Sequence, residues 1–186
     1  MENKTRCAWC EKDDLYRNYH DNEWGKPVYD DETIFEFLIL ETFQTGLSWY
    51  TVLAKRENFR KAFDNFDLMK IANYSEDKMD ALAEDAGIIR NKLKIKATVT
   101  NAQAFIKVQE EFGSFSKYIW GFVDGKPIDN KPKTLNEVKA TTPISDALSK
   151  DLKKRGFKFV GSTVMYAHMQ ATGMVNDHIL ECHTRK

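Results

Sequence analysis

The sequence predicts an all-α fold, and three observations support this prediction. Apolar residues recur at helical spacing through most of the 186 residues. Residues that favour helix ends stand between these segments, with Asp, Ser, Thr or Asn before a segment and glycine after it. No stretch shows the strict alternation of apolar and polar residues that is typical of a half-buried strand. The length favours one domain, residues 1–186, with a substantial core.

Four helices are expected in the first half of the chain. Asp30 or Asp31 is placed to cap the first helix, which runs through Glu41 and is broken at Gly46. Ser75 begins the third, and the acidic residues that follow it suit the helix dipole. The expected ranges are 31–45, 47–63, 75–87 and 91–112.

The second half contains the main loop and three further helices. Residues 121–134 are rich in turn-forming glycine and proline and predict a loop. Thr142 followed by Pro143 is an N-cap with proline at the first helical position. The expected helices run from Pro143 to Gly156, from Ser162 or Thr163 to Gly173, and from Asn176 or Asp177 onward.

Composition, charge and cysteine count indicate which partners and which cellular location to expect. Lys+Arg and Asp+Glu both number 28, so the net charge does not indicate an anionic partner. Basic patches at 90–96 and 150–158 can still bind phosphate, although such runs are also typical of solvated helix faces. We expect a cytoplasmic location and no membrane partner, because the chain shows neither a signal-peptide pattern nor an apolar run of membrane-spanning length. Three cysteines argue against a disulfide framework.

One carboxylate stands at the end of a strongly apolar run. Glu41 follows Phe37 to Leu40, and Trp49 comes eight residues later. Burying a lone carboxylate costs several kcal/mol unless it is hydrogen-bonded. Glu41 therefore needs a partner, in the fold or in a ligand, and Trp49 suggests a pocket for a flat, polar ring. The alternative is that Glu41 caps backbone donors and Trp49 is ordinary core.

Cysteine and histidine residues near both ends suggest a metal site. Cys7 and His20 precede most of the chain, whereas His178 and Cys182 stand at i, i+4, on one face of the last expected helix. Two thiolates and two imidazoles complete a tetrahedral zinc site, which is structural because it leaves no position for water. Cys10 or His183 could replace one of these ligands.

A second constellation could bind DNA phosphates. The helix from Pro143, the turn 156–161 and the helix from Ser162 would form a helix–hairpin–helix element at about 143–173. Gly161 would let backbone N–H groups approach a phosphate at a helix start, while Phe157 and Val160 would anchor the turn in the core. A plain helix connector is the alternative.

Aromatic residues with polar tips form the third constellation. They are Trp9, Tyr16, Tyr19 and Trp24, with Trp49 beyond them. Such side chains could enclose and read a nucleobase, or they could belong to the core.

At these positions the sequence closely resembles the DNA-3-methyladenine glycosylase I family. The resemblance spans Cys7 to Cys182 and includes several long, specific motifs. The matching segments are 19–25, 46–49, 51–53, 55–57, 85–90, 142–146, 154–161 and 175–178. It implies an all-α, two-lobed helix–hairpin–helix DNA glycosylase with one structural Zn²⁺ that joins the chain ends. The implied ligands are Cys7, His20, His178 and Cys182.

The resemblance implies hydrolysis of the N-glycosidic bond of 3-methyladenine in alkylated double-stranded DNA, with free 3-methyladenine as product and a base-flipping step. Glu41 would be the catalytic residue, reading the cationic lesion together with Tyr19. Walls of the base site would be formed by Tyr16, Trp49 and Trp9. The implied DNA-binding residues are Gly46, Leu47, Gly156, Lys158, Val160, Gly161 and Ser162, with Leu47 as an intercalating wedge or, alternatively, a core leucine.

Three departures from the wider superfamily refine these expectations. Ser162 and Thr163 stand where strand-nicking relatives carry lysine, which predicts a monofunctional enzyme that uses water. Asp177 is the nearest candidate for the superfamily's catalytic aspartate, but we expect it to cap the helix that carries His178. Phe159 stands where many hairpins have glycine, so the hairpin backbone could differ.

Two other functions remain as alternatives. A non-catalytic damaged-DNA-binding module would explain the basic patches but not Glu41. A zinc hydrolase would need an open coordination position, which a four-ligand set does not leave. We expect a monomer.

Overall fold

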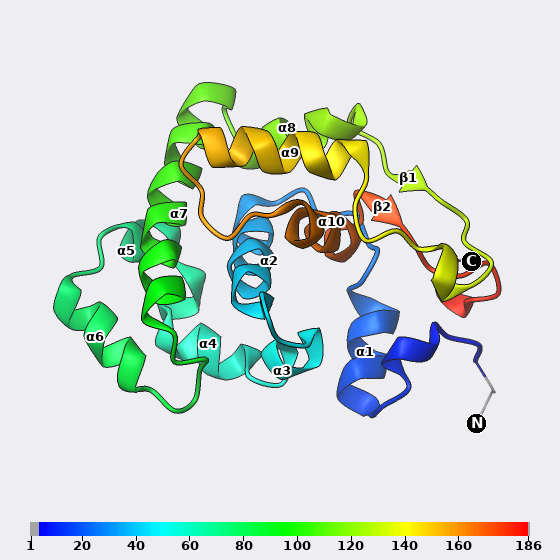
Figure 1. Cartoon of the computed structure of the whole chain (residues 1–186), viewed down its shortest axis with the longest axis horizontal. Helices are drawn as coiled ribbons and strands as arrows, with labels where there is room; N and C mark the ends of the chain where they lie inside the picture. Colours follow the sequence, from blue (N-terminus) through cyan, green and yellow to red (C-terminus); the bar gives the residue numbers. More distant parts are fainter. Residues whose placement is uncertain (1–3, 186) are drawn as a thin grey trace.

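The computed structural model describes residues 4–185 and is organised around the buried helix α2 (Asp31–Gln44). Nine of its 14 residues are buried, so other elements enclose α2 on most of its circumference. The long helix α7 (Lys92–Phe112) and the late helix α10 (Ser162–Ala171) both pack against α2 (Figure 1). The end of α2 therefore lies deep inside the molecule.

The described chain is mostly helical, and none of its helices has the length and apolar character needed to cross a membrane. Besides α2, α7 and α10, the α-helices are α1 (Asp14–Asn22), α3 (Trp49–Leu53), α4 (Arg56–Ala62), α5 (Leu68–Ala72), α6 (Glu76–Glu84), α8 (Phe115–Trp120) and α9 (Pro143–Lys154). The 3-10 turns are η1 (Ala8–Cys10), η2 (Asp64–Phe66), η3 (Gly121–Val123), η4 (Leu135–Glu137) and η5 (His183–Arg185).

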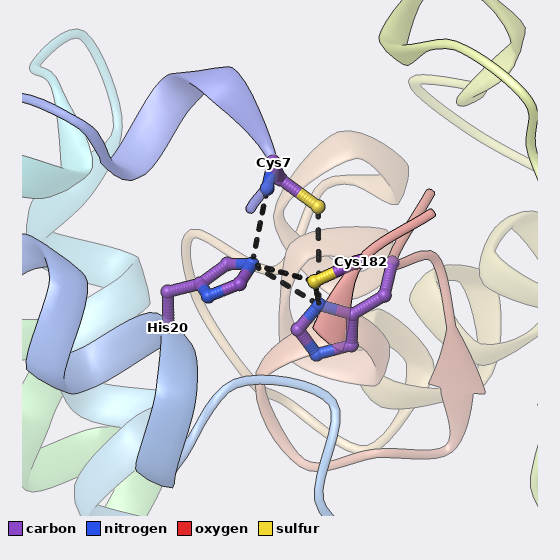
Figure 2. Close-up of side chains that lie close together, drawn as sticks. Cys7, His20 and Cys182 are labelled. Atoms are coloured by element: carbon purple, nitrogen blue, oxygen red, sulfur yellow. Dashed lines mark hydrogen bonds between the residues drawn. The ribbon is translucent and has the colours of Figure 1, made fainter. Parts of the chain in front are cut away.

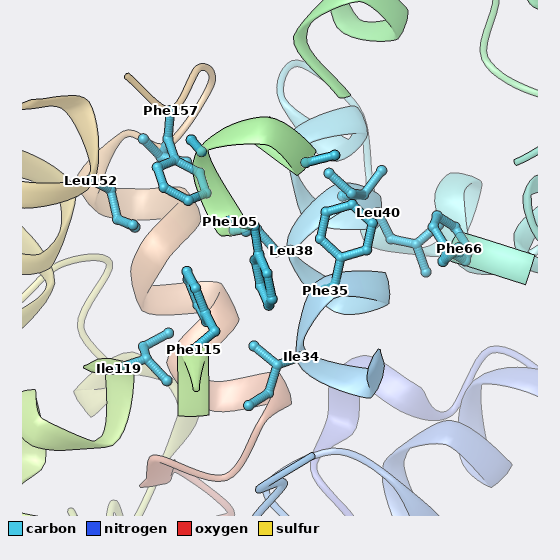
Figure 3. Close-up of a cluster of buried hydrophobic side chains, with 14 of the residues drawn as sticks. Ile34, Phe35, Leu38, Leu40, Phe66, Phe105, Phe115, Ile119, Leu152 and Phe157 are labelled. Atoms are coloured by element: carbon cyan, nitrogen blue, oxygen red, sulfur yellow. The ribbon is translucent and has the colours of Figure 1, made fainter. Parts of the chain in front are cut away.

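The main core lies between α2, α7 and α8. Phe105 of α7 stacks on Phe115 of α8 with ring centroids 3.9 Å apart, and its edge meets Phe35 of α2 (Figure 3). Phe157, from the turn after α9, contacts the same cluster. Burying large aromatic side chains removes much apolar surface from water and fixes the helices in position. The core therefore holds α2 firmly.

The capping signals in the sequence are confirmed at most helix ends. Asp30 accepts a 2.8 Å hydrogen bond from the Thr33 backbone N–H at the start of α2. Thr142 and Ser145 form a reciprocal capping box at the start of α9, with Pro143 at the first helical position. Gly113 ends α7 with φ of 82°, a left-handed conformation that glycine adopts without steric cost.

Two predicted helices have different bounds. The helix expected over 47–63 is divided into α3 and α4 by a bend at Ala54 and Lys55. After the bend, Arg56 is buried and pairs with Glu23 and Glu36, each at 2.6 Å. The helix expected over 75–87 already ends at Glu84.

The helix expected from Asn176 or Asp177 is wrong. Strand β2 (Val175–Asn176) instead pairs in parallel with β1 (Ile128–Asp129), inside the region expected to be only a loop. Residues 177–182 then form irregular structure with a turn at 180–181 rather than a helix. The predicted all-α fold did not include these two-residue strands. They form because the backbone of 128–130 hydrogen-bonds to that of 174–176, which a helix at 176 would not allow. His178 and Cys182 are therefore not on one helical face.

Hydrogen bonds from α7 hold the turn between α9 and α10, although Phe159 stands where many such turns have glycine. Phe159 adopts φ of 57°, the left-handed conformation that glycine favours, so the substitution does not prevent the turn. Asn101 of α7 donates to the Lys158 carbonyl at 3.1 Å and accepts from the Lys158 N–H at 2.7 Å. Phe157 and Val160 are buried on either side, as expected. These contacts stabilise a conformation that is strained for a residue with a side chain.

Candidate functional site

A cavity of about 350 Å³ opens between α1, α2, α3 and α10. This volume lies within the roughly 300–1,000 Å³ of typical small-molecule sites. All five residues predicted to bind the base line it: Trp9, Tyr16, Tyr19, Glu41 and Trp49. The structure thus brings together residues from 9 to 49 that were placed in one site from the sequence.

The walls of this cavity are aromatic. Trp9 meets Tyr16 edge to face with ring centroids 4.9 Å apart, and Tyr19 lies 5.4 Å from Trp49. Trp24, which the sequence also singled out, packs against Trp9 at 5.0 Å. Packed rings leave few alternative rotamers, so the walls form a rigid slot for a flat ring.

Glu41 is only 1 % exposed, and its two oxygens have different surroundings. Oε2 lies 2.6 Å from Nδ1 of His168, on α10. Oε1 has no hydrogen-bond partner among the described residues. Burial raises the pKa of Glu41, and the hydrogen bond with His168 offsets part of that rise. The protein therefore supplies a partner for one oxygen and leaves the other for a ligand.

The cavity also contains hydrogen-bond donors. Trp49 Nε1 is buried and, within residues 4–185, has no partner. Burial, followed by the nearby charge of Glu41, raises the pKa of Tyr19 well above its ordinary value, so its hydroxyl stays protonated. Because unpaired buried polar atoms are costly, Glu41 Oε1 and Trp49 Nε1 indicate a ligand with both a donor and an acceptor.

His168 was missed in the sequence. It lies 127 positions from Glu41, and only the packing of α10 against α2 brings the two together. Its position on α10 carried a signal, because Met165, His168, Met169 and Thr172 follow the i, i+3, i+4, i+7 spacing of a buried face, and all four are buried. A titratable residue on such a face needs a buried partner.

The predicted wedge region adjoins the cavity. Gly46 and Leu47 follow the end of α2, and Leu47 is 42 % exposed rather than part of the core. They line a second hollow of about 270 Å³ that shares Glu41 and Gln44 with the first. Leu47 therefore stands close to the cavity while its side chain remains free.

The predicted phosphate-binding residues lie on and beside the turn between α9 and α10. Lys158 is exposed, and Gly156 adopts φ of 95°. Gly161 is the N-cap of α10, where Ser162 follows with its hydroxyl 2.8 Å from Ser145. The side chain of Val160 is fully buried, so it anchors the turn rather than meeting a solvent-side ligand.

The four predicted metal ligands form one buried cluster. The nitrogen and sulfur atoms that they offer all lie within 4.8 Å of one another. His178 Nδ1 lies 3.2 Å from His20 Nε2, 3.5 Å from Cys182 Sγ and 3.8 Å from Cys7 Sγ. Figure 2 shows Cys7, His20 and Cys182 pointing toward a common centre. A tetrahedral zinc ion has ligand atoms separated by about 3.3–3.8 Å, from its usual bond lengths, so the cluster could hold a metal ion of this kind.

Neighbouring groups orient both imidazoles. His20 Nδ1 lies 2.8 Å from Asp21, which leaves Nε2 facing the cluster. His178 Nε2 lies 3.0 Å from the Trp24 carbonyl, which leaves Nδ1 facing the cluster. Fixing the tautomer through the second ring nitrogen is typical of metal-binding histidines. His183 lies outside the four-residue cluster and contacts Asp21 at 3.1 Å.

Asp177 does not cap a helix, because no helix begins there. It is buried and accepts hydrogen bonds from Tyr166 and Gln170 through Oδ2 and from Asn130 through Oδ1, at 2.7, 2.8 and 2.7 Å. These hydrogen bonds join the chain after β2 to α10 and to the residue that follows β1. Its carboxylate is therefore occupied by the fold.

Comparison with known proteins identifies the family of the chain. The family described as methyladenine glycosylase matches residues 9–186. The chain belongs to this family. It is 49 % identical to DNA-3-methyladenine glycosylase 1 of Escherichia coli over 95 % of both chains. It is 47 % identical to the DNA-3-methyladenine glycosylase of Haemophilus influenzae over 96 % of both.

Solved structures of family members share the fold. A crystal structure of 3-methyladenine DNA glycosylase I superposes with a TM-score of 0.93 at 49 % identity, covering 96 % of this chain and 98 % of that one. A tyrosine-to-phenylalanine variant of such an enzyme, in complex with 3-methyladenine, superposes with a TM-score of 0.94 at 36 % identity, covering 97 % of both chains. The mostly helical architecture is thus that of the glycosylase family.

Proposed function

We propose that this protein is a monofunctional DNA glycosylase that hydrolyses the N-glycosidic bond of 3-methyladenine in alkylated duplex DNA and so initiates base excision repair. The observation that carries the proposal is the pair of unpaired buried atoms, Glu41 Oε1 and Trp49 Nε1, in an aromatic cavity. Relatives named for this activity, and a relative's structure in complex with 3-methyladenine, support the same function.

The cavity suits a base that carries positive charge. Methylation at N3 makes the adenine of the intact nucleotide a cation and a good leaving group. The Glu41 carboxylate attracts this cation, and the faces of Trp9 and Trp49 add cation–π attraction. Neutral adenine gains less from both, so the site favours the lesion once the base is flipped out of the stack. Glu41 is then the catalytic residue and Tyr19 a second base-reading group.

DNA would be held by the surface around the cavity. Leu47 would fill the gap left by the flipped base, as apolar side chains do in other DNA-bending proteins. The turn between α9 and α10 would act as a helix–hairpin–helix element, with Lys158 and the N–H groups at the start of α10 against the phosphates. Ser162 and Thr163 offer no amine for a Schiff base, which favours attack by water without strand cleavage.

The buried cluster of Cys7, His20, His178 and Cys182 fits one structural zinc ion. Two thiolates and two imidazoles complete its coordination, so the ion would link the two ends of the described chain rather than activate water. Burial raises the pKa of Cys7 to about 12, and a bound cation would be needed to keep this thiol ionised. The protein would act as a two-lobed, cytoplasmic monomer.

Base release from methylated duplex DNA tests the proposal. Wild-type protein should free 3-methyladenine, detected by chromatography, and Glu41→Gln should reduce the single-turnover rate by about 100-fold or more, as expected for loss of a group that contacts the reacting base. Glu32→Gln, an exposed residue of the same helix, is the matched control and should behave as wild type. Affinity for damaged DNA should persist in Glu41→Gln.

The same experiment distinguishes a glycosylase from the alternative function, which is DNA binding without catalysis. A non-catalytic damaged-DNA-binding module would bind methylated DNA yet release no base from the folded wild-type protein. That result would overturn the glycosylase proposal.

A further inference from the structure

We propose that His168 is a positioning residue for Glu41: its Nδ1–H fixes one carboxylate oxygen so that the other faces the base, and its neutral ring leaves the negative charge of the pair for a cationic lesion. The proposal deepens the proposed function and rests on it. His168 contacts no base in this arrangement, and it acts through Glu41.

The geometry of the pair supports the positioning role. His168 is fully buried on α10, Glu41 is buried on α2, and Nδ1 lies 2.6 Å from Oε2. This contact joins α2 and α10, which both contribute residues to the cavity lining. A carboxylate held by a single strong hydrogen bond keeps one rotamer, and charge-assisted bonds of this length are stronger than neutral ones. Oε1 is thereby fixed toward the cavity.

The unpaired ring nitrogen of His168 indicates which atoms of the pair carry protons. His168 Nε2 is buried and has no partner within the described chain. A neutral ring with hydrogen on Nδ1 leaves only a lone pair unpaired at Nε2. A charged ring, or a protonated Glu41 that donates to Nδ1, would instead bury an unpaired N–H, and orphaned buried N–H groups are rare. The arrangement with an ionised Glu41 beside a neutral His168 has the better-satisfied donors.

The charge state has a consequence for selectivity. A charged imidazole would neutralise Glu41 before any ligand arrived, and the cavity would then distinguish a cationic base from adenine only weakly. With a neutral imidazole, the pair keeps one negative charge among aromatic walls. A cationic base compensates that charge, whereas a neutral base does not.

A matched pair of variants distinguishes the effect of the hydrogen-bond donor at His168 from the effect of its side-chain shape. His168→Asn places an amide N–H at nearly the position of Nδ1, and His168→Leu has almost the shape of the asparagine without a donor. We expect His168→Asn to stay within about threefold of wild type in single-turnover release of 3-methyladenine from duplex DNA, and His168→Leu to lose about tenfold or more, the effect of one buried hydrogen bond to a charged group.

Two further measurements exclude a purely structural role. His168→Phe fills the volume of the ring without a donor and should fall with His168→Leu, whatever the melting temperatures of the variants. In a Glu41→Gln background, His168→Leu should cause little additional loss, because the group that it positions is already gone. Equal losses in Asn and Leu, better activity in Phe than in Asn, or additive losses with Glu41→Gln would each overturn the positioning role.

The outcomes also separate this proposal from the proposed function. If wild type releases 3-methyladenine and the Asn and Leu variants behave alike, the glycosylase function stands and the role of His168 fails. If wild type releases no base, the proposed function fails, and the role of His168 in it fails too.

Discussion

Nδ1 of His168 lies 2.6 Å from Oε2 of Glu41, although 127 positions separate the two residues in the chain. The contact joins α10 to the buried end of α2, and the second oxygen of Glu41, which lines the aromatic cavity, has no partner among the described residues. A carboxylate in such surroundings is sensitive to protonation, because burial and hydrogen bonding act on its charge in opposite directions. Four predictions follow from this site and its surroundings.

Base release should fall on acidification at a higher pH than an ordinary glutamate would cause. Burial raises the pKa of Glu41 in the folded protein above its usual value of about 4.3. Activity that needs the ionised carboxylate is present above the raised pKa and is lost as pH falls through it. Single-turnover rates measured from about pH 4.5 to pH 8, corrected for spontaneous depurination, should show this acid limb.

Acidification, which lowers activity through Glu41, should raise the free energy of unfolding through the same residue. Because the folded pKa lies above the unfolded one, protonation of Glu41 stabilises the fold as pH falls, so the acid limb does not arise from unfolding at Glu41. The small residual rate of Glu41→Gln should show no such limb. Wild-type rates that stay constant down to the ordinary glutamate pKa would contradict the prediction.

Removing the metal should lower stability and activity together. A strong chelator, or Cys182→Ser, should abolish metal binding measured by atomic absorption and reduce the free energy of unfolding by about 3 kcal/mol or more. For a chain of this length that is a decrease in Tm of about 6–12 °C. Without the ion, the coordination that would link His178 and Cys182 to Cys7 and His20 is lost, and hydrogen bonds such as that of His178 to the Trp24 carbonyl remain.

Cys10→Ser is the matched control for the metal site. Cys10 is also buried, but it lies outside the four-residue cluster, and its thiol lies 3.1 Å from the Cys7 carbonyl as a hydrogen-bond donor. Burial raises the pKa of this thiol to about 12, so it remains protonated. The variant should keep one metal ion per chain. A chelated protein that loses activity but keeps its Tm would instead indicate a catalytic metal.

Leu47→Ala should slow excision from duplex DNA without weakening the base site. The side chain is 42 % exposed, so its truncation should change stability by no more than about 0.5 kcal/mol. Loss of the wedge should reduce base release by about tenfold, since stacking is then not replaced when the base leaves the helix. Binding of free 3-methyladenine, followed by tryptophan fluorescence, should be unchanged.

Leu180→Ala controls for the loss of an exposed leucine. Leu180 is 46 % exposed and lies in the turn after β2, away from the cavity-lining residues. Its substitution should leave excision unchanged. Equal effects at both positions would show that Leu47 has no special role.

Lys158→Ala should weaken DNA binding in a salt-dependent manner. One phosphate contact fewer should reduce the slope of log K against log salt concentration by about 1. Lys107→Ala removes an exposed lysine of α7, outside the turn between α9 and α10, and should leave the slope unchanged. Measuring affinity for the same duplex across a salt series distinguishes the two, and identical slopes for wild type and Lys158→Ala would argue against a phosphate contact at the hairpin.

The sequence predicted the helices well where a capping residue marks the start and a helix-breaking residue marks the end. Asp30, Asn91 and Thr142 accept the expected backbone hydrogen bonds, because an N-cap needs only its own side chain and the next turn. The last predicted helix failed because its backbone pairs with β1, some 47 residues earlier, which local propensity does not register. Phe159 shows the same limit, since contacts from Asn101 hold it in a conformation that its type disfavours.

The residue types of this site are evident in the sequence: a carboxylate in an apolar run, aromatic residues near it, and a Cys/His set of zinc type. These are chemical properties of single residues and short spacings, and all of them occur where the structure forms its cavity and its Cys/His cluster. The contact of Glu41 with His168 and the exposure of Leu47, in contrast, depend on how the helices pack in three dimensions. Distances between helices far apart in the chain arise from core packing, which no short segment encodes.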